Sequence, residues 1–334
     1  METSLMTFSK RLLRWAGACA AALACNAAMA ADDAADYPAR PITLLVGFPA
    51  GGPADQAARI LADRLQSAWH GARIVVENRG GANGTIAAAA MTKAAPDGYT
   101  LFLVTRSHVN VKWLYKTLPF DVEKDFQPVA VLLTMPNVLV VGPSVKEKDY
   151  ASLARDIAAK PDTFTAFSSG NGSDPHLALA EFQDKTGLRI RHIPYKGGAQ
   201  GMMDMLSGRV DLSFATLGTV MAQIQQGKLR GFAIGGEARN PQLPDVPTFA
   251  EVGVKDFSPQ AWYGVMAPAG TPPAIVAKLN RTINQVMNTP EGRKQLAQMG
   301  ALPARLSPQE FAKLYAHDIA VNGRLIQELH VGVD

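Results

Sequence analysis

Two loops rich in glycine and small polar residues carry the groups of this chain that could bind a small anion. The first, residues 48–55 (Phe-Pro-Ala-Gly-Gly-Pro-Ala-Asp), follows an apolar run at 42–46 and opens an amphipathic segment. Pro53 suits the first position of a helix, because a proline lacks the N–H group that would be unpaired there. Gly51 and Gly52 allow a close approach of the backbone to a ligand. The free N–H groups and the positive end of the helix dipole at such a start favour an anion.

The second loop, residues 168–176 (Ser-Ser-Gly-Asn-Gly-Ser-Asp-Pro-His), also follows a predicted strand and enters a helix through a proline. The pair could hold an anion from two sides, although each loop alone is also consistent with an ordinary strand-to-helix turn. Asp55 either caps its helix or accepts a hydrogen bond from a ligand amine or hydroxyl group. His176 either contacts the ligand or packs as a structural histidine.

Two basic residues follow other predicted strands. Arg106, in Thr-Arg-Ser-His at 105–108, comes directly after the strand at 99–104. Its guanidinium could bind a carboxylate through two hydrogen bonds, or it could be a solvated surface group. Lys196, in Tyr-Lys-Gly-Gly-Ala at 195–199, could add positive potential to a binding cleft or lie exposed.

No motif in the sequence indicates catalysis, a metal or a cofactor. There is no G-x-S-x-G nucleophile turn and no phosphate-binding P-loop, and the six histidines show no H-x-x-x-H spacing. The glycines at 47–52 lack the G-x-G-x-x-G spacing of a dinucleotide site. With 33 basic and 29 acidic residues and no basic block, the chain also offers little to a nucleic acid. We predict no catalytic residue, metal or cofactor; the absence of such motifs does not exclude an enzyme, but nothing in the residues argues for one.

The first thirty residues are typical of a secretory signal. Lys10, Arg11 and Arg14 precede an apolar stretch at 15–25, and Ala-Met-Ala at 28–30 is an A-x-A cleavage site. A lipoprotein modified at Cys25 is the weaker alternative. Both cysteines of the chain lie in this segment, which excludes disulfides and thiolate sites from the rest. The sequence thus predicts cleavage after residue 30 and export to a bacterial periplasm.

Strand-like and helix-like segments alternate along the rest of the chain. One run covers residues 42–104 and a second covers residues 138–234, and each predicts parallel strands with helices on the faces. The tail from 272 is mostly helical, and Ser307 and Glu310 form a capping box for its last helix. Two α/β lobes of this kind leave a cleft where strand ends and helix starts converge.

The sequence resembles the Bug (TctC-like) family, the substrate-binding receptors of tripartite tricarboxylate transporters. The resemblance runs in family order over essentially all of residues 31–334. It rests on stretches that include Tyr-Pro-Ala-Arg-Pro-Ile at 37–42, Phe-Pro-Ala-Gly-Gly at 48–52, Val-Glu-Asn-Arg at 76–79, Ala-Ala-Pro-Asp-Gly-Tyr-Thr-Leu at 94–101, Leu-Pro-Phe-Asp at 118–121, Ser-Gly-Asn-Gly-Ser at 169–173, Pro-Tyr-Lys-Gly at 194–197, Leu-Pro-Asp-Val-Pro-Thr at 243–248, Trp-Tyr-Gly at 262–264 and Ala-Pro-Ala-Gly-Thr-Pro at 267–272.

This resemblance implies a type II periplasmic binding protein, in which two doubly wound α/β lobes surround a ligand cleft. Residues 31–136 and 261–334 would form lobe 1, and residues 137–260 would form lobe 2. The protein would be a monomer that captures a small carboxylate and delivers it to a two-component membrane permease. The predicted ligand-binding residues are Phe48, Ala50, Gly51, Gly52, Asp55, Arg106, Ser107, Gly170, Asn171, Gly172, Ser173, His176, Lys196, Ala215 and Thr216.

Three alternatives stay open at this point. The receptor could report ligand to a membrane sensor, it could serve an ABC importer, or the chain could be a secreted hydrolase or lyase.

The sequence departs from the family pattern at positions that bear on the ligand. Ala215 and Thr216 stand where the family usually places an aspartate, and Arg106 stands among residues that are usually small and polar. Gly80 replaces a usual proline. The first two changes favour a ligand with a second acidic group over one with an amine.

Overall fold

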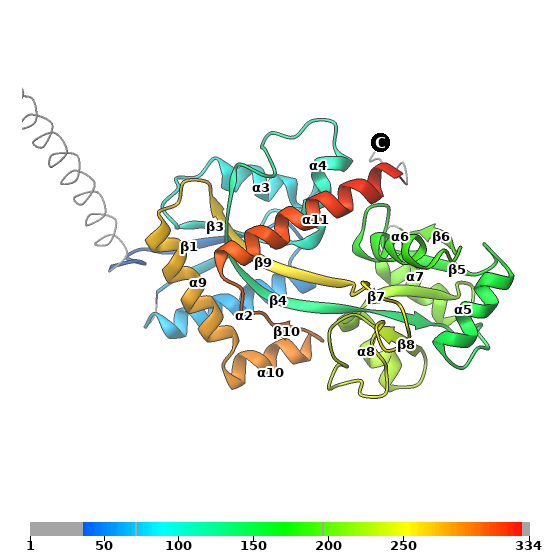
Figure 1. Cartoon of the computed structure of the whole chain (residues 1–334). Coiled ribbons are helices and arrows are strands. Elements are labelled where there is room, and N and C mark those ends of the chain that lie inside the picture. Colours follow the sequence, from blue (N-terminus) through cyan, green and yellow to red (C-terminus); the bar gives the residue numbers. More distant parts are fainter. Residues whose placement is uncertain (1–35, 71, 196, 329–334) are drawn as a thin grey trace, which may run out of the picture.

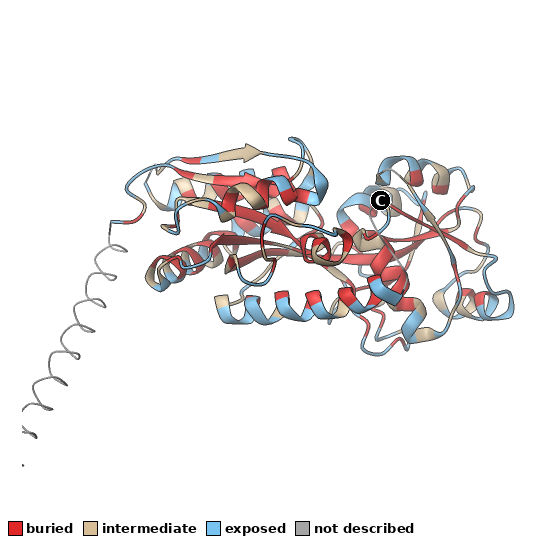
Figure 2. Cartoon of the chain, turned by 90° about the horizontal axis from the view of Figure 1, so that it is seen from above, coloured by how far each residue is buried: buried red, intermediate tan, exposed pale blue. Residues whose placement is uncertain are grey.

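The computed structural model describes residues 36–70, 72–195 and 197–328. The predicted signal at 1–30 and Lys196 lie outside these ranges. A ten-stranded sheet extends through both halves of the molecule in the order β2-β1-β3-β9-β4-β7-β5-β6, with β8 and β10 also paired to β4 (Figure 1). Buried residues follow this sheet and the inner faces of the helices, whereas the outer helix faces are exposed (Figure 2).

The first half of the sheet is built on β1 (Ile42–Val46). It pairs in parallel with β2 (Ile74–Asn78) and β3 (Thr100–Thr105), as the alternating pattern predicts. Ala57, Leu61, Leu65 and Trp69 recur at four-residue intervals, which predicts one apolar helix face. Helix α2 (Pro53–Ala68) buries the first three against one side of this sheet, and Trp69, directly after the helix, packs partly buried against the same cluster. Helix α3 (Thr85–Thr92) contributes to a second apolar cluster on the other side. Strands covered on both faces are expected to be apolar throughout, which explains the sequence of β1.

Two long antiparallel strands connect the halves. In β4 (Phe126–Val141), the residues up to Pro136 pair with β9 (Gln260–Pro268), and those from Asn137 onward pair with β7 (Leu212–Thr216). The same part of β4 pairs on its other side with β8 (Arg230–Ile234). A single strand therefore belongs to both lobes.

The second half repeats the parallel arrangement. Strand β5 (Thr165–Ser168) pairs in parallel with β6 (Arg191–Pro194) and with β7. The covering helices are α5 (Tyr150–Ala159), α6 (Asp174–Thr186), α7 (Gly198–Leu206) and α8 (Leu217–Gln225). Phenylalanines fill the core on one side of this sheet, with Phe182, Phe214, Phe249 and Phe257 in ring contact.

The tail comprises α9 (Pro273–Met287), α10 (Pro290–Gln298), the short strand β10 (Leu302–Pro303) and α11 (Pro308–Glu328). The predicted capping box is present, since the Ser307 N–H donates to Glu310 Oε2 at 2.8 Å and the Glu310 N–H donates to Ser307 Oγ at 3.2 Å. Helix α11 runs along lobe 1 and reaches α6 of lobe 2 (Figure 1). No helix within the described ranges has the length and apolar character to cross a bilayer.

Candidate functional site: a cavity between the lobes

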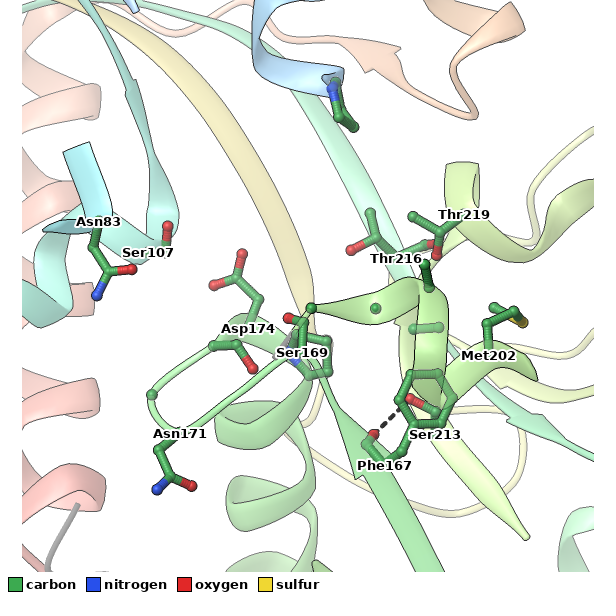
Figure 3. A pocket seen from close by; sticks show the side chains of 18 of the residues that line it. Asn83, Ser107, Phe167, Ser169, Asn171, Asp174, Met202, Ser213, Thr216 and Thr219 are labelled. Carbon is green, nitrogen blue, oxygen red and sulfur yellow. Dashed lines mark hydrogen bonds between the residues drawn. The ribbon is translucent and has the colours of Figure 1, made fainter. Parts of the chain in front are cut away.

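Two adjoining cavities separate the lobes. The larger, of about 800 Å³, is lined by residues of both halves of the sheet. The smaller, of about 520 Å³, lies on the side of lobe 1. They share four lining residues: Phe48, Pro53, Ser107 and Asp174. We call the two cavities together the interlobe cleft, and Figure 3 shows the larger of them.

The first predicted loop connects β1 to α2 and is organised by Asp55. This carboxylate is 2% exposed and accepts hydrogen bonds from the Gly51 N–H at 2.9 Å, Asn78 Nδ2 at 3.0 Å and Arg59 Nε at 2.9 Å. The hydrogen bond from Arg59 lowers the pKa of Asp55, so the side chain is ionised at neutral pH. Asp55 thus holds the loop from behind, with Gly51 in the left-handed region at φ +84°.

The cleft side of this loop is the start of a helix. Gly52, Pro53 and Ala54 line the smaller cavity. The Ala54 N–H has no acceptor among the described residues, as is usual for the first turn of a helix. The loop therefore presents a backbone donor and the positive end of the α2 dipole to the cleft.

The second predicted loop connects β5 to α6 and rests on two histidines. The Gly172 N–H donates to His176 Nδ1 at 3.1 Å, and the His176 ring stacks on His192 with 3.9 Å between centroids. His192 Nε2 in turn lies 2.7 Å from Ser168 Oγ. The histidines lie behind the loop, whose Asn171, Gly172 and Ser173 line the larger cavity. His176 therefore has the structural role that the sequence analysis left open.

The histidine stack predicts that acid weakens the fold. Burial lowers the pKa of His176 and of His192 from 6.5 to about 4, with the neighbouring His192 adding to the shift of His176. The unfolded chain then binds more protons, so the free energy of unfolding should fall as the pH drops from about 6.5 to about 4. Urea unfolding across this range measures the effect.

The matched variant for this experiment is His176→Asn, whose amide oxygen can accept the Gly172 N–H bond without titrating. The free energy of unfolding of this variant should depend less on pH than that of the natural chain. The remaining slope includes His108, whose pKa burial lowers to about 3. Equal slopes for the two proteins would contradict the role given to the stack.

Arg106 requires a correction, because it lies neither on the surface nor among the residues that line the cleft. It is 7% exposed, its Nε lies 3.2 Å from Asp318 Oδ2, and its Nη2 lies 3.4 Å from Asn322 Oδ1. Asp318 also accepts a hydrogen bond from Trp262 Nε1 at 2.7 Å. The guanidinium therefore ties the η2 turn (Arg106–Asn110) to α11.

A protein-family model described as "Tripartite tricarboxylate transporter family receptor" (TctC) matches residues 57–331. The chain belongs to this family. The family comprises solute-binding receptors, so this protein is a receptor and not an enzyme. This excludes the hydrolase alternative. The two-lobed fold expected from the resemblance is confirmed by the solved relatives of the receptor.

Three relatives illustrate the match. Protein BugT of Bordetella pertussis is 38% identical over 298 residues, which cover 88% of the receptor and 91% of BugT. The structure of Rpa4515 of R. palustris with adipate is 33% identical with a TM-score of 0.75, over 89% of the receptor and 100% of that chain. MatC (Rpa3494) from Rhodopseudomonas palustris with bound malate is 30% identical with a TM-score of 0.71, over 87% and 100% of the two chains.

The cleft of the receptor is lined by most of the predicted site residues. Those that line it are Phe48, Ala50, Gly52, Ser107, Asn171, Gly172, Ser173, Ala215 and Thr216. The other predicted residues that the structure describes do not line either cavity; they are Gly51, Asp55, Arg106, Gly170 and His176.

Several lining residues were not assigned to the site from the sequence. They are Asn83, Thr105, Phe167, Ser169, Asp174, Met202, Ser213, Thr219 and Tyr263. Four of them lie in stretches already singled out: Ser169 and Asp174 in the second loop, Thr105 in the stretch at 105–108 and Tyr263 in the Trp-Tyr-Gly stretch at 262–264. The others face the cleft only because the sheet and its helices fold around it.

Proposed function

We propose that the receptor captures one small carboxylate in the interlobe cleft and delivers it to the membrane permease of a tripartite transporter. The observation that carries this proposal is the convergence of two helix starts. Pro53 and Ala54 of α2 come from lobe 1, Ser173 and Asp174 of α6 come from lobe 2, and all four line the cleft. Each helix start carries about half a positive charge, which suits a carboxylate, and the α2 start adds the unpaired N–H group of Ala54.

Backbone groups, rather than basic side chains, would hold this carboxylate. No lysine or arginine lines either cavity within the described part of the chain. Serine, threonine and asparagine side chains supply the remaining polar contacts, and apolar groups such as Phe48 and Phe167 cover the carbon skeleton. The mixture is typical of small-molecule sites, where a few polar groups orient a ligand within an apolar pocket. The bound adipate and malate of the two solved relatives support an acid as ligand.

We further propose residues 31–136 with 261–334 as one lobe and residues 137–260 as the other, in a periplasmic monomer from which the signal at 1–30 has been cleaved. The change of partner within β4, from β9 at Pro136 to β7 at Asn137, supports this division. Closure on the ligand would be a hinge motion at this change of partner, favoured because the ligand contacts both loops.

A thermal-shift screen tests the proposal. The chain from residue 31 is heated with dicarboxylates, aromatic acids and amino acids, and with methyl esters of the same acids as controls. An acid at one hundred times its dissociation constant should stabilise the fold by about 2.7 kcal/mol and raise the melting temperature by about 5 °C. The esters, which lack the charge, should have little effect. If every acid left the melting temperature unchanged, the proposal would be wrong.

A further inference from the structure

One carboxyl group in the cleft has no function in the arrangement described so far. Asp174 is the first residue of α6 and lines both cavities. Its Oδ1 atom is buried and has no hydrogen-bond partner among the described residues. Figure 3 shows the side chain pointing from the loop into the cavity. Buried carboxyl oxygens in folded proteins are almost always paired, so an unpaired one beside a cavity suggests a partner that arrives with the ligand.

No basic side chain is hydrogen-bonded to Asp174 among the described residues. Among the described residues that line the cleft, it is the only one with a carboxyl group, and none of the others has a basic side chain; burial raises the pKa of Tyr263 and keeps that phenol neutral. Arg106 exerts an attraction on Asp174 but is hydrogen-bonded to Asp318. Burial raises the pKa of Asp174, Arg106 opposes the shift, and Asp318 adds to it.

A carboxyl group without a basic partner should favour some ligand groups over others. A second carboxylate near Asp174 would repel its ionised form in a partly buried site, where screening by water is weak. A hydroxyl group would supply the missing donor, and an ammonium group would supply both the donor and a positive charge that favours the ionised form of Asp174. The two helix starts lie beside Asp174, so one ligand could place its carboxylate on them and its donor on Asp174.

We propose that Asp174 determines the specificity of the receptor by accepting a hydrogen bond from a donor group of the ligand, which makes acids that also carry an ammonium group the preferred class. Acids with a hydroxyl group come second, and unsubstituted dicarboxylates come last. This inference rests on the proposed function of the same cleft. It replaces the expectation, based on Arg106 and Ala215, of a ligand with a second acidic group.

The experiment compares acids that share a carbon skeleton. Butanoate, 2-hydroxybutanoate, 2-aminobutanoate and butanedioate are titrated calorimetrically into the chain from residue 31 at pH 7.5, and the series is repeated on five-carbon and phenyl-bearing skeletons. The test variant is Asp174→Asn, which keeps the shape of the side chain and removes its charge. The matched control is Asp184→Asn on the same helix, where the carboxylate pairs with Arg324 at the surface.

The natural chain should bind the 2-amino acid at least tenfold more tightly than the unsubstituted acid. Asp174→Asn should lose this factor of ten, improve binding of the dicarboxylate severalfold and leave the unsubstituted acid within twofold. Asp184→Asn should change none of the affinities. The inference is wrong if Asp174→Asn leaves the 2-amino acid within twofold, or if the natural chain prefers the dicarboxylate.

The two proposals fail in different ways. If acids bind but their ranking does not depend on Asp174, only the inference about specificity is overturned. If no acid of any skeleton binds, the proposed function fails and the inference falls with it. Circular dichroism and the melting temperature of Asp174→Asn show whether the variant keeps the fold.

Discussion

Replacement of Arg106 by methionine is expected to lower the free energy of unfolding by about 3–5 kcal/mol. Its side chain is 9% exposed and that of Asp318 is 7% exposed, so the variant leaves an uncompensated carboxylate in the protein interior. The loss also removes the hydrogen bond from the guanidinium to Asn322. Urea unfolding monitored by tryptophan fluorescence measures the change.

The matched control is Arg324→Met. Arg324 lies in α11, as Asp318 does, and its ion pair with Asp184 joins this helix to lobe 2 at the surface. With side chains 58% and 45% exposed, this pair should contribute at most about 1 kcal/mol. Arg106→Met protein that is still folded should bind an unsubstituted monocarboxylate with nearly unchanged affinity, since the guanidinium does not line the cleft. A stable Arg106→Met variant that had lost its affinity for dicarboxylates would restore the role first expected of this arginine.

Replacement of Thr216 by tryptophan is expected to reduce ligand affinity at least a hundredfold. Thr216 lies at the end of β7 and lines the larger cavity (Figure 3), and its side chain does not cap α8. An indole ring there would occupy space that the ligand needs. Because the new ring enters an existing cavity, it should change the free energy of unfolding by less than about 1 kcal/mol.

The control for this substitution is Thr163→Trp, in an exposed turn before β5 and away from the cleft. It should bind acids as the natural chain does. Calorimetric titration of both variants with an acid that stabilises the natural chain makes the comparison. Equal affinities for Thr216→Trp and Thr163→Trp would mean that the ligand binds elsewhere.

Local sequence patterns were sufficient for much of the fold. The face of Ala57, Leu61 and Leu65 predicts α2, and the glycine at 187 ends α6 in the left-handed conformation typical of a helix end. The first part of β4 was not predicted, because Pro128 and Pro136 interrupt its apolar run. The structure accommodates the first proline beside an irregularity in the pairing with β9.

The site was predicted where it depends on neighbouring residues and missed where it depends on distant ones. Both loops combine turn glycines with a helix start, and both line the cleft. The partner of Arg106 is Asp318, 212 residues further along the chain, and no local spacing reveals such a pair. Asp174 was passed over because an aspartate in the first turn of a helix is ordinary on electrostatic grounds. Only its unpaired oxygen and its place in the cleft distinguish it.

Native mass spectrometry of the receptor purified from a periplasmic extract tests capture in the interlobe cleft most directly. We expect a population heavier by one small organic acid per chain, which is released on denaturation and absent from the Thr216→Trp variant. The identity of that acid would also show whether it carries a hydrogen-bond donor for Asp174, such as an ammonium or hydroxyl group. A natural chain with no bound acid and no affinity for any, or a Thr216→Trp variant that keeps the acid, would contradict capture in the interlobe cleft.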